Sequence, residues 1–286
     1  MGDCSVIKKK IRAVLQKCPK LYRVVWINYG RCQKLYRGFR HIRATGTQMT
    51  RCYCIAPGKK LVYVVNCKVA SSSLKANVQD LGPIDNYQQV WAMGKGELYP
   101  SDVNIDDYPG YYFFSFVRNP FRRLVSCYEN KFHTDVELSG KPGRRLYQDD
   151  LYFDQYLMGY VARDKGFKAF AKKVSKIPDK WADRHFISQA FLLHDASGRD
   201  ICQFVGKMED LPDAYEPIRQ KYGMAELPHY NQTTVKTESG KWMDYYDLES
   251  YAWIYNRYQA DIEQFGYQAD AENLKAYLLQ KAAKAQ

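Results

Sequence analysis

The sequence lacks several features that would place it in a common class of protein. It has no run of about 18 apolar residues, and its N-terminus lacks the apolar core of a secretory signal. Its eight cysteines are too sparse in 286 residues for a disulfide scaffold, which favours reduced thiols in a cytoplasm. No second close pair of Cys or His accompanies Cys32, Cys52 and Cys54, so we expect no metal site. We therefore expect a chain without a transmembrane segment.

Acidic residues are almost absent from the start of the chain. Residues 1–60 contain fifteen Lys or Arg and one acidic residue, Asp3, so the remainder of this +12 chain is close to neutral. Apolar residues at helical spacing over 7–25 predict a basic amphipathic helix, and 28–58 is expected to be irregular. Such a segment either keeps the protein soluble or favours an anionic partner: nucleic acid, an acidic polysaccharide or, through residues 1–45, a membrane surface.

The main domain is expected to begin near Lys60, which makes residues 1–59 a basic helical or irregular extension and residues 60–286 the main domain. Continuous apolar runs separated by helical patterns are typical of strands that are buried on both faces. The sequence therefore predicts an α/β fold with a central, mostly parallel β-sheet flanked by helices. The expected strands are 61–65, 111–117 and 201–205, and the expected helices are 71–81, 120–132, one that follows 201–205, 247–264 and a polar, alanine-rich tail.

The end of the first strand has the residues of an anion site. The stretch "NCKVASSS" places Lys68 and three serines where a helix begins, and free backbone N–H groups at a helix N-terminus attract phosphate. A Walker A loop requires G-x-x-x-x-G-K-[ST], whereas here no glycine is present and the lysine precedes the hydroxyls. The pattern therefore disfavours ATP with magnesium.

A second strand end carries "FVRNPFRRLVSCYENKF", residues 116–132. Arg118 follows the strand, and Ser126 lies about two turns into the next helix. A guanidinium and a hydroxyl at this spacing can converge on one phosphate, because Arg binds phosphate bidentately.

Together these stretches resemble the carbohydrate sulfotransferases of the Golgi type, which include the chondroitin 4-O-sulfotransferases and the HNK-1 sulfotransferase. The resemblance runs from about Val62 to Tyr267. It also covers "DRHF" at 183–186, which is similar to a D-x-H-W element, and "FVGKMEDL" at 204–211, which is similar to F-[IV]-G-K-x-E-x-L. It implies a P-loop-like sulfotransferase fold and a 3′-phosphoadenosine-5′-phosphosulfate (PAPS) donor.

The resemblance also implies roles for individual residues. The loop of Lys68, Val69, Ala70, Ser71, Ser72 and Ser73 would hold the 5′-phosphosulfate, with Lys68 also catalytic, whereas Arg118 and Ser126 would hold the 3′-phosphate. His185 is the expected base and Asp183 its orienting partner. Asn231 and Thr233, in "HYNQTTVK", lie where relatives have a further donor-binding loop.

The expected acceptor is a hydroxyl of a neutral or anionic carbohydrate, and neither nucleic acid nor a metal is expected as a partner. Two alternatives stay open: a kinase-like phosphotransferase, and a non-enzymatic binder of anionic polymers that uses the basic N-terminus. Relatives from animals carry a membrane anchor that this sequence lacks. This favours a soluble, bacterial-type enzyme in the cytoplasm over a Golgi enzyme whose anchor was removed.

Overall fold

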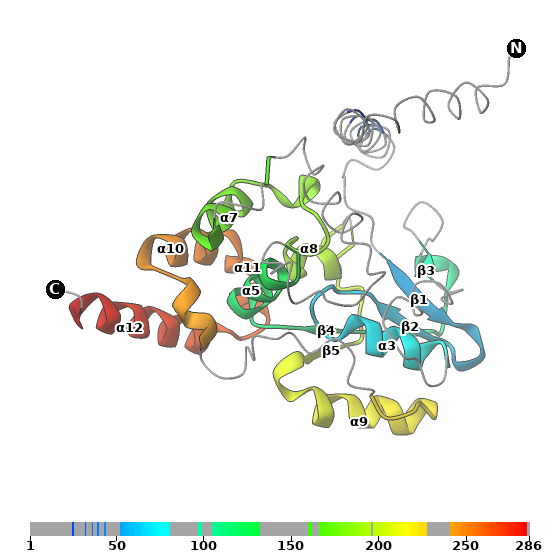
Figure 1. Ribbon diagram of the computed structural model, residues 1–286. Helices are drawn as coiled ribbons and strands as arrows, with labels where there is room; N and C mark the ends of the chain where they lie inside the picture. The colour runs from blue at the N-terminus through cyan, green and yellow to red at the C-terminus, as the bar shows by residue number, and fades with distance from the viewer. Residues whose placement is uncertain are drawn as a thin grey trace, which may run out of the picture.

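The structure is a computed structural model that describes residues 52–80, 97–98, 105–131, 160–161, 166–195, 197–227 and 241–284, together with Val25, Cys32, Tyr36, Phe39 and Arg43. Within these residues the model is an α/β protein (Figure 1). Its strands are β1 (Tyr53–Ala56), β2 (Leu61–Val64), β3 (Glu97–Leu98), β4 (Tyr112–Val117) and β5 (Phe204–Lys207). Its α-helices are α3 (Ser71–Val78), α5 (Pro120–Lys131), α7 (Gly166–Ser175), α8 (Gln189–Leu193), α9 (Leu211–Tyr222), α10 (Leu248–Arg257), α11 (Gln259–Gln264) and α12 (Gln268–Lys284). Short 3-10 helices are η1 (Pro57–Lys59), η2 (Ile105–Asp107), η6 (Asp179–Trp181), η7 (Met208–Asp210) and η9 (Lys241–Tyr245).

The five strands form one sheet in the order β3-β1-β2-β4-β5. β2, β4 and β5 pair in parallel, whereas β1 pairs antiparallel with both β2 and β3. The expectation of a mostly parallel sheet is therefore wrong on the β1 side. For β1 and β2 the reason is the short connection through η1, because a turn of this length can join only antiparallel strands.

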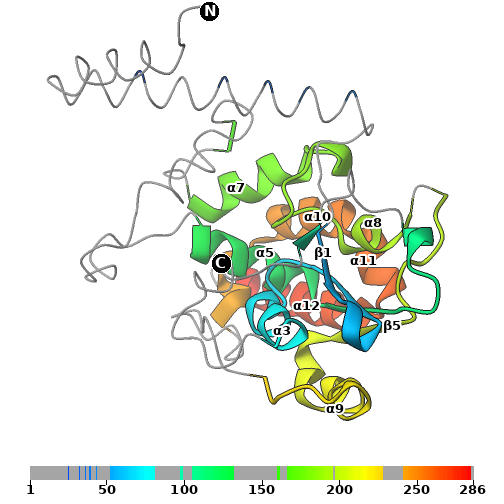
Figure 2. The same cartoon turned by 90° about the vertical axis from the view of Figure 1, so that its right-hand side faces the viewer.

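Helices cover both faces of the sheet, as the continuous apolar strands predicted. Alternate strand residues such as Val62 and Phe113 pack on one face in a core shared with α5, α7, α8, α10, α11 and α12. Their neighbours, such as Tyr63 and Phe114, pack on the other face with α3 and α9. Figure 1 shows α9 beneath the sheet and α7 and α10 on the opposite side, and Figure 2 shows the same arrangement from the side. β2 and β4 read as unbroken apolar runs because both of their faces are covered.

Three boundaries differ from the expected ones. Cys32, Tyr36, Phe39 and Arg43 are helical, so the expectation of irregular chain over 28–58 is wrong there, and β1 also lies within that range. The spacing of these four residues is that of one helix face, whereas the nearby glycines and threonines suggested a loop. The structure does not test the division at residue 60.

The last sheet strand and the helix after residue 247 also differ. β5 covers Phe204–Lys207 rather than 201–205, because Gly206 and Lys207 continue the ladder although neither extends the apolar run. The single helix expected over 247–264 is interrupted at Tyr258, which separates α10 from α11. The other helices and strands expected after residue 60 lie within a few residues of their predicted positions. The amphipathic helix expected over 7–25 lies outside the described residues except for Val25, which is helical.

Gly206 lets β5 approach β4 closely. A Cβ atom at position 206 would lie 2.5 Å from Cε1 of Phe116, a ring that is fully buried and cannot move aside freely. We expect Gly206→Ala to lower the free energy of unfolding by about 1–3 kcal/mol through overpacking. Urea denaturation measures this, with Gly58→Ala as the matched control because nothing lies within 4 Å of its added Cβ. Equal stability of the two variants would contradict the packing described.

Candidate active site

The loop between β2 and α3 has the backbone conformation of an anion site. Lys68 and Ala70 both have positive φ angles, 72° and 55°, which residues other than glycine adopt rarely. α3 begins at Ser71, and its N-cap residue, Ala70, has no side chain that could accept a hydrogen bond from the first turn. Strained backbone beside an uncapped helix N-terminus is typical of a loop that binds a negatively charged group.

The chain after β4 meets this loop. The Arg118 guanidinium donates from Nη1 to the main-chain oxygen of Lys68 at 3.2 Å. The next residue, Asn119, caps α5, since its Oδ1 accepts from the N–H groups of Phe121 and Arg122 at 3.0 and 3.2 Å. The structure therefore brings together the two strand ends on which the sequence analysis concentrated.

These strand ends lie at a topological switch point of the sheet, where the helices that follow two neighbouring strands cover opposite faces. β2 and β4 are parallel neighbours, yet α3 packs on one face of the sheet and α5 on the other. In open α/β sheets, ligands bind beyond the carboxyl ends of strands at such a switch point. The fold therefore places Lys68 and Arg118 where a ligand is expected.

His185 and Asp183 form a hydrogen-bonded pair. Nδ1 of His185 lies 2.5 Å from Oδ1 of Asp183, and the same oxygen accepts the main-chain N–H of His185 at 3.0 Å. Both side chains are largely buried, with 14% and 6% of their surface exposed. Where Asp183 is ionised it can only accept a hydrogen bond, so a neutral His185 then carries its proton on Nδ1 and has Nε2 as its basic nitrogen.

Gln189 holds the main chain of Arg118 at both ends. Its Oε1 accepts the Arg118 N–H at 2.9 Å, and its Nε2 donates to the Arg118 oxygen at 2.8 Å. Oε1 also accepts from Nδ2 of Asn66, the residue two positions before Lys68, at 3.0 Å. Gln189 was not among the residues expected from the sequence, although it lies three residues after the "DRHF" stretch at 183–186.

Glu209 also holds the turn between β4 and α5, at Asn119. One of its carboxylate oxygens accepts the N–H of Asn119 at 2.9 Å, and the other accepts the hydroxyl of Tyr267 at 3.0 Å. Glu209 belongs to the "FVGKMEDL" stretch, so that stretch has a structural explanation in this chain. Burial and the adjacent Glu209 carboxylate raise the pKa of Tyr267, which therefore stays a neutral donor.

A buried carboxylate supports Gln189 in turn. Asp261 is fully buried and accepts the N–H groups of Gln189 and Ala190 at 2.9 and 2.8 Å, at the start of α8. Burial raises the pKa of Asp261, although these two hydrogen bonds and the charge of Arg123 act in the opposite direction. α11 is thereby tied to the residue that orients Arg118.

The remaining residues of the predicted site differ in how far they are exposed to solvent. Ser71 and Ser72 are half-buried, Ser73 and Ser126 are buried, and Val69 packs in the core beneath α3. Asn231 and Thr233 lie outside the described residues.

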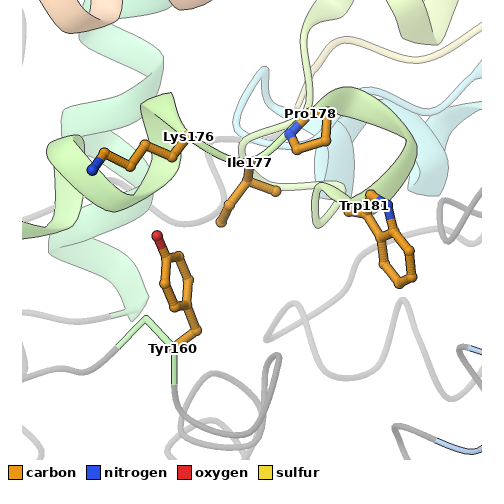
Figure 3. Close-up of a pocket in the computed structure, with 5 residues that line it drawn as sticks. All are labelled: Tyr160, Lys176, Ile177, Pro178 and Trp181. Atoms are coloured by element: carbon orange, nitrogen blue, oxygen red, sulfur yellow. The ribbon is translucent and has the colours of Figure 1, made fainter.

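Two cavities lie away from these strand ends. One, of about 270 Å³, is lined by Tyr160, Lys176, Ile177, Pro178 and Trp181, with the Tyr160 hydroxyl directed toward the segment of Lys176 (Figure 3). The other, of about 370 Å³, lies at the amino end of β4, opposite Arg118. Neither includes a residue of the predicted site. In the part of the chain that is described, no group of three or more His, Cys, Asp or Glu could hold a metal ion.

The stability of the start of α8 depends on pH through the ionisation of Asp179. It accepts the N–H and hydroxyl of Ser188 at 2.8 and 2.7 Å and pairs with Arg257. Burial alone would raise the pKa of Asp179, but the hydrogen bond and charge of Arg257 and the bonds from Ser188 lower it overall. Ionised Asp179 therefore stabilises the fold above its unfolded pKa of about 3.9, and this contribution disappears as pH falls through the lower folded value.

We expect the free energy of unfolding to fall as the pH is lowered below about 4, partly through this group. Urea denaturation between neutral and acidic pH measures the slope. Asp179→Asn should reduce stability at neutral pH and flatten the acid slope, whereas an unchanged slope in the variant would assign the loss to other carboxylates.

A comparison with protein families agrees with this geometry. The model described as "Sulfotransferase family" matches residues 51–268, which include both strand ends, His185 and Glu209. The chain belongs to the sulfotransferase family and is thus an enzyme that transfers sulfuryl groups. No curated protein and no solved structure gives a significant match to it. Among the helices in the described ranges, none is both long and apolar enough to cross a membrane.

Proposed function

We propose that the chain transfers a sulfuryl group from PAPS to a hydroxyl of a carbohydrate. The observation that carries this proposal is the contact between Arg118 and the Lys68 loop, at the switch point between β2 and β4. A donor with phosphates at both its 5′ and 3′ positions requires two separate cationic groups at a fixed distance from each other. The proposal assigns one strand end to each phosphate.

The residues at this place fit such a donor. The positive φ angles of Lys68 and Ala70 and the uncapped start of α3 favour an anion, and the hydroxyls of Ser71, Ser72 and Ser73 add donors. Arg118 and Ser126 would hold the 3′-phosphate, and Asn231 and Thr233 would belong to a further donor-binding loop. When bound, PAPS supplies an activated sulfuryl group on a good leaving group.

The chain's own residues then supply charge and a base. Lys68 places a positive charge where negative charge develops on the leaving phosphate oxygen, which stabilises the transition state more than the ground state. His185, held by Asp183, accepts the proton of the acceptor hydroxyl at Nε2. The remaining acceleration comes from fixed positions, since in-line transfer needs the hydroxyl, sulfur and leaving oxygen to be aligned.

The acceptor is proposed to be a glycan, and the basic residues 1–59 would attract an acidic one. Transfer itself is assigned to residues 60–286. Incubation of the full chain with PAPS and a panel of neutral and acidic saccharides, in EDTA, tests this proposal by mass spectrometry. Sulfated saccharide and adenosine 3′,5′-bisphosphate are expected products. Phosphorylated saccharide from ATP and magnesium, without sulfation, would favour the kinase-like alternative.

A further inference from the structure

Arg123 is a buried cation whose hydrogen bonds go to main-chain oxygens. It lies in the second turn of α5, and only 2% of its surface is exposed. Within the described residues no carboxylate forms an ion pair with it. Its Nε donates to the oxygen of Cys67 at 3.0 Å, Nη1 to that of Ile187 at 2.6 Å, and Nη2 to that of Arg184 at 3.2 Å.

These three oxygens belong to the two segments that the proposed reaction must align. Cys67 directly precedes Lys68, and Arg184 directly precedes His185. The planar guanidinium presents several N–H groups in fixed directions, so a single side chain can hold two segments at a defined separation. A lysine in its place has one nitrogen and cannot reproduce this fork.

Its three hydrogen bonds direct the Arg123 guanidinium to the main chain of these segments rather than to a bound donor or acceptor. Moving a charged group out of water is costly unless hydrogen bonds compensate it, and here the three main-chain oxygens provide that compensation. The Arg123 charge therefore lies inside the fold, where it links the Lys68 loop to the His185 segment, and not at the surface of the site.

We propose that Arg123 is a positioning residue that sets the separation between Lys68 and His185. The inference rests on the proposed function for its catalytic consequence, although the link between the two segments is independent of it. An error of about 1 Å in the placement of reacting groups can lower a rate by about a hundredfold. The geometry points to Arg123 as the residue that prevents this error.

The kinetic test compares Arg123→Lys with the unchanged chain. The variant keeps the charge but loses the fork, so we expect kcat to fall by about ten- to a hundredfold. The affinity for adenosine 3′,5′-bisphosphate should change by less than about threefold, because Gln189 still holds Arg118. An unchanged kcat, or an equal loss of kcat and affinity, would overturn the proposal.

Ser250→Ala is the matched control for a general loss of stability. Ser250 is the N3 residue of the α10 capping box, away from both segments, and its buried hydroxyl accepts the main-chain N–H of Asp247 at 2.9 Å, a hydrogen bond that contributes about 1 kcal/mol. We expect this control to unfold more readily with kcat unchanged. A drop in kcat like that of Arg123→Lys would mean that lost stability alone explains the effect.

Native-state hydrogen exchange on the unchanged chain tests the link without any activity. If Arg123 joins the segments, residues 65–70 and 182–188 should open with the same free energy, as one cooperative unit. Different opening free energies would overturn the proposal even if Arg123→Lys does not fold. If exchange shows one unit but the chain transfers no sulfuryl group, the proposed function fails while the link stands.

Discussion

Replacement of Lys68 by alanine is expected to lower sulfuryl transfer by about a hundred- to a thousandfold, the range found when one group that stabilises a transition-state oxyanion is removed. The affinity for adenosine 3′,5′-bisphosphate should fall only slightly. The serines and the start of α3 still bind the 5′-phosphate, and the Lys68 side chain acts mainly on charge that develops during transfer. Single-turnover kinetics and calorimetry measure the two quantities separately.

Lys59→Ala is the matched control for Lys68→Ala. Lys59 lies before β2, at the opposite end from Lys68, and pairs with Asp80. The control removes the same charge from the other end of β2, away from the Lys68 loop, so transfer should be almost unchanged. Transfer by Lys68→Ala at the rate of this control would remove Lys68 from the catalytic role.

Replacement of Arg118 by alanine is expected to weaken binding of adenosine 3′,5′-bisphosphate by about ten- to a hundredfold, since hydrogen bonds to charged groups contribute about 1.5–3 kcal/mol. The loss should be specific to the 3′-phosphate. The unchanged chain is expected to prefer the bisphosphate to adenosine 5′-monophosphate, and the variant should lose most of that preference. Calorimetric titration with both nucleotides measures the ratio of affinities.

Arg122→Ala provides the control for Arg118→Ala. Arg122 lies four residues further along the chain, on α5, with its guanidinium 5.8 Å from the centre of the Trp242 ring. Its removal changes the net charge equally but should leave the nucleotide preference intact. If both variants lose affinity to the same extent, general electrostatic attraction rather than a 3′-phosphate site explains the result.

The sequence predicted the parts of the fold that depend on local pattern. α3 begins at Ser71 and α5 at Pro120 as expected, because a polar or proline start followed by apolar residues at helical spacing determines such helices locally. β1 was missed because its four residues lie between basic segments. It becomes a strand only through pairing with β2 and β3, a contact that no local pattern encodes.

The sequence pointed to candidate residues where a side chain itself carries the chemistry. Lys68 and Arg118 were singled out by residue type and position after a strand, and His185 by the resemblance of "DRHF" to a family element. The structure shows in addition that the Arg118 guanidinium donates to the main-chain oxygen of Lys68. Gln189 and Arg123 could not be identified in this way, because both act on main-chain atoms of distant residues. Such contacts depend on the packed arrangement of α5 and α8 and leave no characteristic spacing in the sequence.

The most direct test of the account is calorimetric titration of the full chain with adenosine 3′,5′-bisphosphate in EDTA, beside a titration with ATP and magnesium. The account predicts metal-independent binding of the bisphosphate in the micromolar range or tighter, because the Lys68 loop and Arg118 each bind one phosphate. Binding of ATP with magnesium but not of the bisphosphate would contradict it and favour the kinase-like alternative. Failure of both nucleotides to bind would favour a binder of anionic polymers.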